Sequence, residues 1–234
     1  MAFTIDRVGP WGRAQDEYMR MFALSDADLS RRILGCGDGP ASFNAQATSR
    51  GAKVLSLDPI YAFSAAEIEA RVQQTREQMI RGARNNHADF IWDKTRSLVA
   101  SPDELEIRRM GAMRNFLNDL PVGARDGRYL AAALPDLPLR DNSFDLALSS
   151  HFLFLYSEHL GLEFHRRALR DMLRVAGEVR IFPLLQIGGA PSPLVEPIVQ
   201  ELRRDGYVAE RIKVLYEFQR GGNHMLRVVK KDIT

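Results

Sequence analysis

The residues that point most directly to chemistry are three alternating glycines and one later aspartate. Gly35, Gly37 and Gly39 follow an apolar segment, and Asp58 ends a second apolar segment, residues 53–57. Glycine has no Cβ atom, so this turn can lie against a ligand with main chain alone. A carboxylate roughly twenty residues later, where a second strand returns beside the first, can accept hydrogen bonds from both hydroxyls of a ribose. The pattern favours a cofactor that contains a nucleoside.

The composition is that of an ordinary folded domain. The chain has 234 residues, 45% of them hydrophobic and 26% charged, with a formal net charge of +2. This charge gives no general attraction to nucleic acid or to an anionic membrane, and no apolar run is long enough to cross a bilayer. Residues 1–10 lack the apolar core of a signal peptide, and the single cysteine, Cys36, cannot form an internal disulfide. We expect one cytoplasmic α/β domain over residues 1–234.

Strands and helices are expected to alternate along most of the chain. A helical segment is predicted over residues 1–30, and Pro40 is predicted to open the helix that follows the glycine turn. The strands are predicted at residues 33–34, 54–57, 128–134, 144–150, 178–185, 212–218 and 224–229. Because the last two read as a hairpin, the alternation predicts a mostly parallel sheet with one antiparallel strand.

Residues 62–128 depart from this alternation. Ser64 and Ser101 each begin a helical pattern and carry a glutamate three residues later, which is the spacing of a capping box. We interpret the segment as a helical insertion packed on the sheet. It either covers the site as a lid or connects the strands without a role in the site.

The glycine spacing separates two classes of cofactor. A dinucleotide fingerprint counted from Gly35 requires glycine or alanine where this chain has Pro40. The G-x-G-x-G turn, the acid at Asp58 and the run LPLRDNSFDLALSS over residues 137–150 together resemble the class I S-adenosylmethionine-dependent methyltransferases. The resemblance covers residues 31–60 and 128–231. It implies a three-layer Rossmann-like fold with a seven-stranded sheet, and S-adenosylmethionine as the cofactor.

The resemblance also implies roles for individual residues. The glycine turn lies under the methionine part of the cofactor, Asp58 binds the ribose, and the residues after Asp58 flank the adenine. The end of the strand at 144–150 lines the methyl-transfer pocket, where His151 lies. The expected cofactor-binding residues are Gly35, Cys36, Gly37, Asp38, Gly39, Asp58, Pro59, Ile60, Leu134, Ser149 and Ser150.

Two positions depart from the family pattern. The family usually has an acid two residues before the first glycine, where this chain has Ile33, and often an acid after the third strand, where this chain has Ala133. Each missing polar contact weakens cofactor binding by about 1 kcal/mol. Asp38 and Asp136 lie near these positions in the sequence and are candidates to compensate.

Methyl transfer makes limited demands on catalytic side chains. A sulfonium methyl group is already an activated electrophile, so the protein has to align the acceptor and exclude water. A base helps only where the acceptor must lose a proton, and His151 is the candidate, with a purely structural ring as the alternative. Phe152, Phe154 and Tyr156 either line an apolar acceptor pocket or pack in the core.

Other chemistries have weaker support. Glu158, His159, Glu163 and His165 are better explained as a solvated helix start with one buried histidine, so we expect no metal site. Two rows of arginines suit nucleic acid in principle, but neighbouring glutamates favour solvated helix faces. The rows comprise Arg71, Arg76, Arg81 and Arg84, and Arg166, Arg167, Arg170 and Arg174.

The sequence therefore predicts methyl transfer from S-adenosylmethionine to an oxygen or nitrogen of a small molecule near His151. We expect neither nucleic acid nor a membrane as a partner. Two alternatives stay open: a non-catalytic module that binds S-adenosylmethionine, and an NAD-dependent oxidoreductase, which Pro40 disfavours.

Overall fold

The computed structural model describes residues 11–230, so the expectation for residues 1–10 lies outside the described residues. The elements in chain order are α1 (Gln15–Met21), α2 (Asp26–Leu29), β1 (Arg32–Cys36), α3 (Phe43–Thr48), β2 (Lys53–Leu57), η2 (Pro59–Ala62), α4 (Ala65–Asn85), η3 (His87–Asp89), α5 (Pro102–Arg125), β3 (Tyr129–Leu130), β4 (Phe144–Ser150), α6 (Ser157–Val175), β5 (Ala176–Phe182), α7 (Val195–Arg204), β6 (Tyr207–Lys213) and β7 (His224–Lys230).

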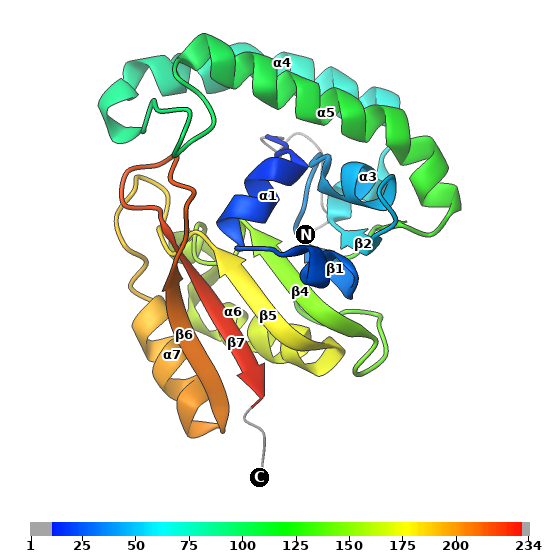
Figure 1. The fold of residues 1–234 in the computed structure, drawn as a ribbon, viewed down its shortest axis with the longest axis vertical. Coiled ribbons are helices and arrows are strands. Elements are labelled where there is room, and N and C mark those ends of the chain that lie inside the picture. Colours follow the sequence, from blue (N-terminus) through cyan, green and yellow to red (C-terminus); the bar gives the residue numbers. More distant parts are fainter. Residues whose placement is uncertain (1–10, 231–234) are drawn as a thin grey trace.

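Seven strands form one sheet in the order β3-β2-β1-β4-β5-β7-β6 (Figure 1). The pairs β1–β2, β1–β4, β2–β3 and β4–β5 are parallel, whereas β7 runs antiparallel to both β5 and β6. The predicted mostly parallel seven-stranded sheet with an antiparallel C-terminal hairpin is confirmed. Because parallel strands end at one edge, the carboxyl ends of β1, β2 and β4 meet there, where open α/β sheets bind their ligands.

Side chains alternate between the two faces of the sheet. In β1, Ile33 packs with Tyr18 of α1 and Phe43 of α3, whereas Leu34 packs with residues of α6 and α7, among them Leu169. Period-two alternation sends neighbouring side chains of a strand to opposite faces. Both faces of the sheet are therefore covered, which gives the three expected layers.

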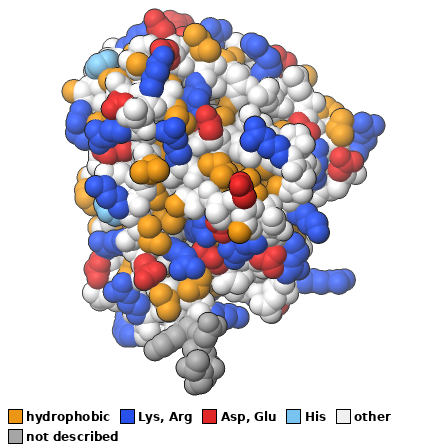
Figure 2. All heavy atoms as spheres, in the orientation of Figure 1, with side chains coloured by type: hydrophobic (Ala, Val, Ile, Leu, Met, Phe, Trp, Pro, Cys, Tyr) orange, Lys and Arg blue, Asp and Glu red, His pale blue; other side chains and the backbone are white. Residues whose placement is uncertain are grey.

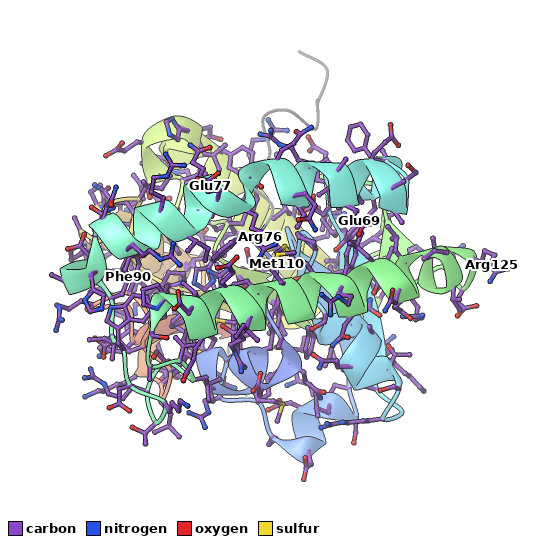
Figure 3. The ribbon with its side chains drawn as sticks, turned by 90° about the horizontal axis from the view of Figure 1, so that it is seen from above. Glu69, Arg76, Glu77, Phe90, Met110 and Arg125 are labelled. Carbon is purple, nitrogen blue, oxygen red and sulfur yellow. The ribbon has the colours of Figure 1, made fainter. Side chains whose placement is uncertain are left out.

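The insertion forms the two long helices of the structure, α4 and α5. The Ser64 hydroxyl accepts a hydrogen bond from the Glu67 amide, and the Ser101 hydroxyl accepts one from the Glu104 amide, as the capping pattern predicts. The helices lie side by side and cross above the carboxyl ends of the strands (Figures 1 and 3). Arg76, which lies between them in Figure 3, pairs with Glu106 of α5 at 2.6 Å. Whether this pair acts as a lid stays a prediction.

Two predicted strands are shorter than expected. The strand predicted at 128–134 is reduced to β3, because β2 offers it only Ser56 and Leu57 as partners, after which residues 132–134 turn toward a cavity. The strand predicted at 178–185 ends at Phe182, because Pro183 has no N–H group to continue the ladder.

Two other boundaries were predicted wrongly. The helix after the glycine turn begins at Phe43 instead of Pro40, and the amide of Ser42 donates to the Arg13 carbonyl at 3.0 Å. The first hairpin strand lies at 207–213 instead of 212–218. The apolar alternation after residue 213 has another cause, because Tyr216 and Phe218 are buried against α1 and the segment after α4.

Candidate active site

A cavity of about 460 Å³ lies at the carboxyl ends of β1, β2 and β4. Residues from six separate parts of the chain line it: Trp11, Arg13, Gly37, Gly39, Pro40, Leu57, Asp58, Pro59, Met79, Ala132, Ala133, Leu134, Ser150, His151, Phe152, Leu155, Tyr156, His159 and Leu160. Of the predicted site residues, seven line this cavity: Gly37, Gly39, Asp58, Pro59, Leu134, Ser150 and His151. The topology therefore brings together side chains that are far apart in the sequence.

The three glycines of the turn serve two different purposes. Gly37 and Gly39 line the cavity with φ values of +70° and +54°, a region that favours glycine. A Cβ atom on Gly39 would meet no atom within 4 Å, so its main chain is open to a ligand. A Cβ atom on Gly35, by contrast, would lie 1.8 Å from a carboxylate oxygen of Asp38. Gly35 thus makes room for Asp38 and does not line the cavity.

Asp38 is turned beneath the glycine turn and does not line the cavity. Its carboxylate accepts hydrogen bonds from the Tyr18 hydroxyl at 2.9 Å and from the Ser56 hydroxyl at 2.6 Å. Burial raises the pKa of Asp38 to about 6, and the nearby Asp58 charge adds to this shift. Cys36, predicted in the same binding set, is also buried, and its main chain belongs to β1. Asp38 and Cys36 therefore support the loop from below.

Asp58 lies at the cavity wall, where β2 ends. One carboxylate oxygen accepts from the Gly39 amide and the other from the Ile60 amide, both at 2.9 Å. Each oxygen keeps a second lone pair for a ligand hydroxyl. Burial raises the pKa of Asp58 to about 6, although the hydrogen bonds from the Ile60 and Gly39 amides act to lower it. Asp58 thus joins the glycine turn to the end of β2 and presents acceptors to the cavity.

The predicted adenine region is apolar. Pro59 and Leu134 line the cavity, whereas Ile60 is fully buried among residues of α4 and α5. Ala133 also lines it and brings no polar side-chain group. Asp136 does not compensate for this, because its exposed carboxylate pairs with Arg167 at 2.6 Å.

The end of β4 places a histidine against the cavity. His151 has a φ of +54°, and its amide donates to the Phe182 carbonyl at 2.7 Å. Its Nδ1 lies 2.9 Å from the Ser150 hydroxyl, while the preceding Ser149 is buried and does not line the cavity. Burial, followed by the charges of Arg13 and Arg109, holds the pKa of His151 well below its usual value. The ring is therefore neutral at neutral pH.

The aromatic run after His151 divides between two roles. Phe152 and Tyr156 line the cavity, whereas Phe154 is buried and stacks on His165. His165 is held on both ring nitrogens, since Nε2 accepts from the Phe154 amide at 3.0 Å and Nδ1 lies 2.6 Å from the Gly161 carbonyl oxygen. The prediction of one buried histidine in this helix is confirmed.

Several lining residues were not among the predicted site residues. Arg13 comes from the segment before α1, Met79 from α4, and His159 and Leu160 from the first turn of α6. No short-range motif marks Arg13 or Met79, because tertiary packing alone brings them to the cavity. Trp11, two residues before Arg13, also lines the cavity.

The two arginine rows lie mainly in ion pairs. Arg81 and Arg84 pair with Glu77 and Asp103, and Arg166 and Arg174 pair with carboxylates on α6, α7 and the loop before β4. On the face shown in Figure 2, positive and negative side chains are interspersed. This arrangement favours solvated helix faces over a nucleic-acid surface. None of the described helices is long and apolar enough to span a membrane.

The mostly parallel seven-stranded sheet with its antiparallel C-terminal hairpin is the Rossmann-like fold of class I S-adenosylmethionine-dependent methyltransferases. The protein resembles magnesium protoporphyrin IX methyltransferase from Synechocystis with bound S-adenosylmethionine (12% identity, TM-score 0.46, covering 88% of this chain and 73% of that one). It also resembles 1,6-didemethyltoxoflavin-N1-methyltransferase from Burkholderia thailandensis (14% identity, TM-score 0.43, covering 86% of this chain and 72% of that one). A third similar structure is a methyltransferase from Thermotoga maritima (14% identity, TM-score 0.45, covering 92% of this chain and 88% of that one). At these identities the likeness concerns the fold alone.

Sequence comparison identifies the family. The chain is 33% identical over 218 residues to the uncharacterized protein MJ0045 of Methanocaldococcus jannaschii, covering 92% of this chain and 93% of that protein. The chain therefore belongs to the family of MJ0045. No protein-family model matches it.

Proposed function

We propose that this protein transfers the methyl group of S-adenosylmethionine to an oxygen or nitrogen of a small molecule. The main observation in support of the proposal is that Gly37, Gly39 and Asp58 line one cavity. The open space above the Gly39 main chain suits a closely packed ligand, and the free lone pairs of Asp58 suit ribose hydroxyls. S-adenosylmethionine, when bound, supplies a methyl group on an electrophilic sulfonium.

The chain's own residues would do the remaining work. Asp58 holds the ribose, and the apolar surfaces of Pro59 and Leu134 accept the adenine. His151 is neutral, and in the tautomer whose Nδ1–H donates to Ser150, its Nε2 carries a free lone pair. His151 would accept the proton that an acceptor hydroxyl or amine loses as it gains the methyl group.

The acceptor space in this proposal lies beyond His151. Phe152, Leu155, Tyr156 and Leu160 give it an apolar wall, and Met79 reaches it from α4. Such a wall suits a small apolar or aromatic acceptor and excludes water from the transfer. The cavity volume is in the range of small-molecule sites.

Calorimetry with S-adenosylhomocysteine and, separately, with NAD tests the cofactor. We expect micromolar or tighter binding of S-adenosylhomocysteine and none of NAD. Tighter binding of NAD would replace the proposal with the oxidoreductase alternative.

A second measurement separates an enzyme from a binding module. The protein would be incubated with methyl-labelled S-adenosylmethionine and a panel of small phenols, carboxylates and amines, and the label counted in the product. Binding of S-adenosylhomocysteine without label transfer to any acceptor would favour the non-catalytic module.

A further inference from the structure

One cationic side chain in the cavity lacks an ion-pair partner among residues 11–230. Arg13 lines the cavity, its Nε–H finds no acceptor, and its Nη1 reaches only the Trp11 carbonyl at 3.3 Å. No ion pair of Arg13 occurs within this described part of the chain. The described arginines of comparably low exposure, such as Arg109, Arg128 and Arg180, are held by carboxylates, and Arg13 differs from them.

Glu17, the carboxylate whose charge acts on Arg13, is already engaged by other groups. Glu17 accepts two hydrogen bonds from Arg109, at 2.6 and 2.7 Å, and one from the Tyr216 hydroxyl at 2.8 Å. Arg108 Nε lies 3.4 Å from the same carboxylate. Arg108 also pairs with Asp16, so Glu17 and Asp16 together balance the charges of Arg108 and Arg109. The positive charge of Arg13, which lines the cavity, is then left over.

Arg13 keeps its own charge in these surroundings. Burial, followed by the Arg109 charge, lowers the pKa of Arg13 to about 10, so the group is still protonated at neutral pH. A partly buried cation without an ion-pair partner is unfavourable, and a bound anion would offset that cost.

The main chain fixes Arg13 beside the glycine turn. The Arg13 carbonyl accepts from the Ser42 amide at 3.0 Å. A Cβ atom on Gly12 would lie only 2.0 Å from the Pro40 carbonyl oxygen, so the two segments are in close contact. Arg13 and His151 line the same cavity. Arg13 therefore shares the cavity wall with both the glycine turn and the candidate base.

We infer that Arg13 binds a carboxylate group of a ligand held in this cavity. The guanidinium fork matches a carboxylate with two parallel hydrogen bonds. The inference rests on the proposed function, which supplies two sources of such a group. One is the amino-acid carboxylate of the cofactor, and the other is a carboxylate on the methyl acceptor.

Two nucleosides separate these sources by calorimetry. S-adenosylhomocysteine carries the amino-acid carboxylate, whereas methylthioadenosine has the same adenosine and thioether but lacks it. Both would be titrated into the wild type, Arg13→Met and Arg13→Lys. Arg20→Met is the matched control, because Arg20 lies outside this cavity and donates to the Thr95 carbonyl. Benzoate, as a carboxylate probe, would be titrated into the protein saturated with S-adenosylhomocysteine.

If the cofactor supplies the carboxylate, Arg13→Met lowers the affinity for S-adenosylhomocysteine roughly 10- to 100-fold, and Arg13→Lys lowers it less. Neither substitution then changes the affinity for methylthioadenosine. Unchanged binding of methylthioadenosine also shows that the variant is folded. If the acceptor supplies it, Arg13→Met leaves both nucleosides unchanged and abolishes the benzoate binding seen in the wild type.

Two results overturn the inference. One is an Arg13→Met variant with wild-type affinity for S-adenosylhomocysteine and benzoate, and the other is an equal loss for both nucleosides. If the wild type binds neither nucleoside, the proposed function itself is refuted. In that event benzoate binding to the ligand-free protein, present in the wild type and lost in Arg13→Met, would still support a carboxylate site.

Discussion

At the scale of single residues, Asp58 decides whether the cavity can hold a nucleoside. The Gly39 and Ile60 amides donate to different oxygens of Asp58, so asparagine keeps an acceptor for only one of them and also removes the negative charge that ribose hydroxyls would meet. We expect Asp58→Asn to raise the dissociation constant of S-adenosylhomocysteine roughly 10-fold, and Asp58→Ala to raise it more. Calorimetry measures both. An unchanged constant in both variants would remove Asp58 from the ribose role.

The raised pKa of Asp58 also predicts a pH dependence of binding. With a pKa of about 6, the group is ionised at pH 7 and becomes protonated as the pH falls through that value. A protonated carboxyl group loses acceptor capacity, so affinity for S-adenosylhomocysteine should fall by up to about tenfold per pH unit below pH 6. Asp38 titrates in the same range beneath the loop. A dependence that survives in Asp58→Asn and vanishes in Asp38→Asn would contradict this assignment.

The sequence predicts those site residues that belong to a short motif, and it does not predict those that only the packing of distant segments brings to the site. Gly37, Gly39 and Asp58 form a motif with fixed spacing, and they line the cavity as predicted. Gly35 fits the same motif for another reason, because only the fold shows that Asp38 occupies the space beside it. Arg13 carries no motif at all, and packing between distant segments places it.

At the scale of elements, a buried ionic cluster joins α1 to α5 and to the segment after β6. Glu17 of α1 is fully buried and bonds Arg109 of α5 and Tyr216. Glu17→Gln would leave the buried guanidinium group of Arg109 without its counter-ion, so we expect a loss of about 3–5 kcal/mol in the free energy of unfolding. Urea denaturation measures it.

The control for this prediction is Asp16→Asn on the same helix. Asp16 pairs with Arg108 at the surface, so its loss should cost no more than about 1 kcal/mol. Burial opposes the ionisation of Glu17, but Arg109 and its neighbours lower the pKa to about 2. Its contribution should therefore be complete above the unfolded pKa of about 4.5 and disappear as the pH falls through about 2. Equal losses of unfolding free energy in Glu17→Gln and Asp16→Asn would show that the buried ion pairs stabilise the fold no more than the surface pair does.

Element boundaries show where sequence patterns have limited reach. The strand at 144–150 is predicted residue by residue, because turn residues precede it and its apolar run is buried between two parallel neighbours. The apolar alternation at 212–218 is equally clear, yet only its start belongs to β6. The same alternation buries Phe218 against Phe90 and Trp92 instead. Periodicity reports burial, and it does not say which neighbour causes the burial.

At the scale of the whole molecule, the cavity is lined by the segment before α1, the residues at and after the ends of strands β1, β2, β3 and β4, and parts of α4 and the start of α6. Figure 1 shows α4 and α5 crossing above these strand ends. Met79 is the residue through which α4 reaches the cavity. A ligand that fills the cavity would contact α4 on one side and the sheet edge on the other, and would hold them together.

Hydrogen exchange with and without S-adenosylhomocysteine tests this arrangement. We expect amides near Met79 and at the start of α6 to exchange at least several-fold more slowly with ligand, because local opening of these segments would break contacts with it. The β6–β7 hairpin contributes no residue to the cavity wall and should be unaffected. Protection of the glycine turn and of Asp58 without any change in α4 would mean that the insertion connects the strands but does not cover the ligand. Uniform protection of the whole sheet would indicate global stabilisation rather than closure over the cavity.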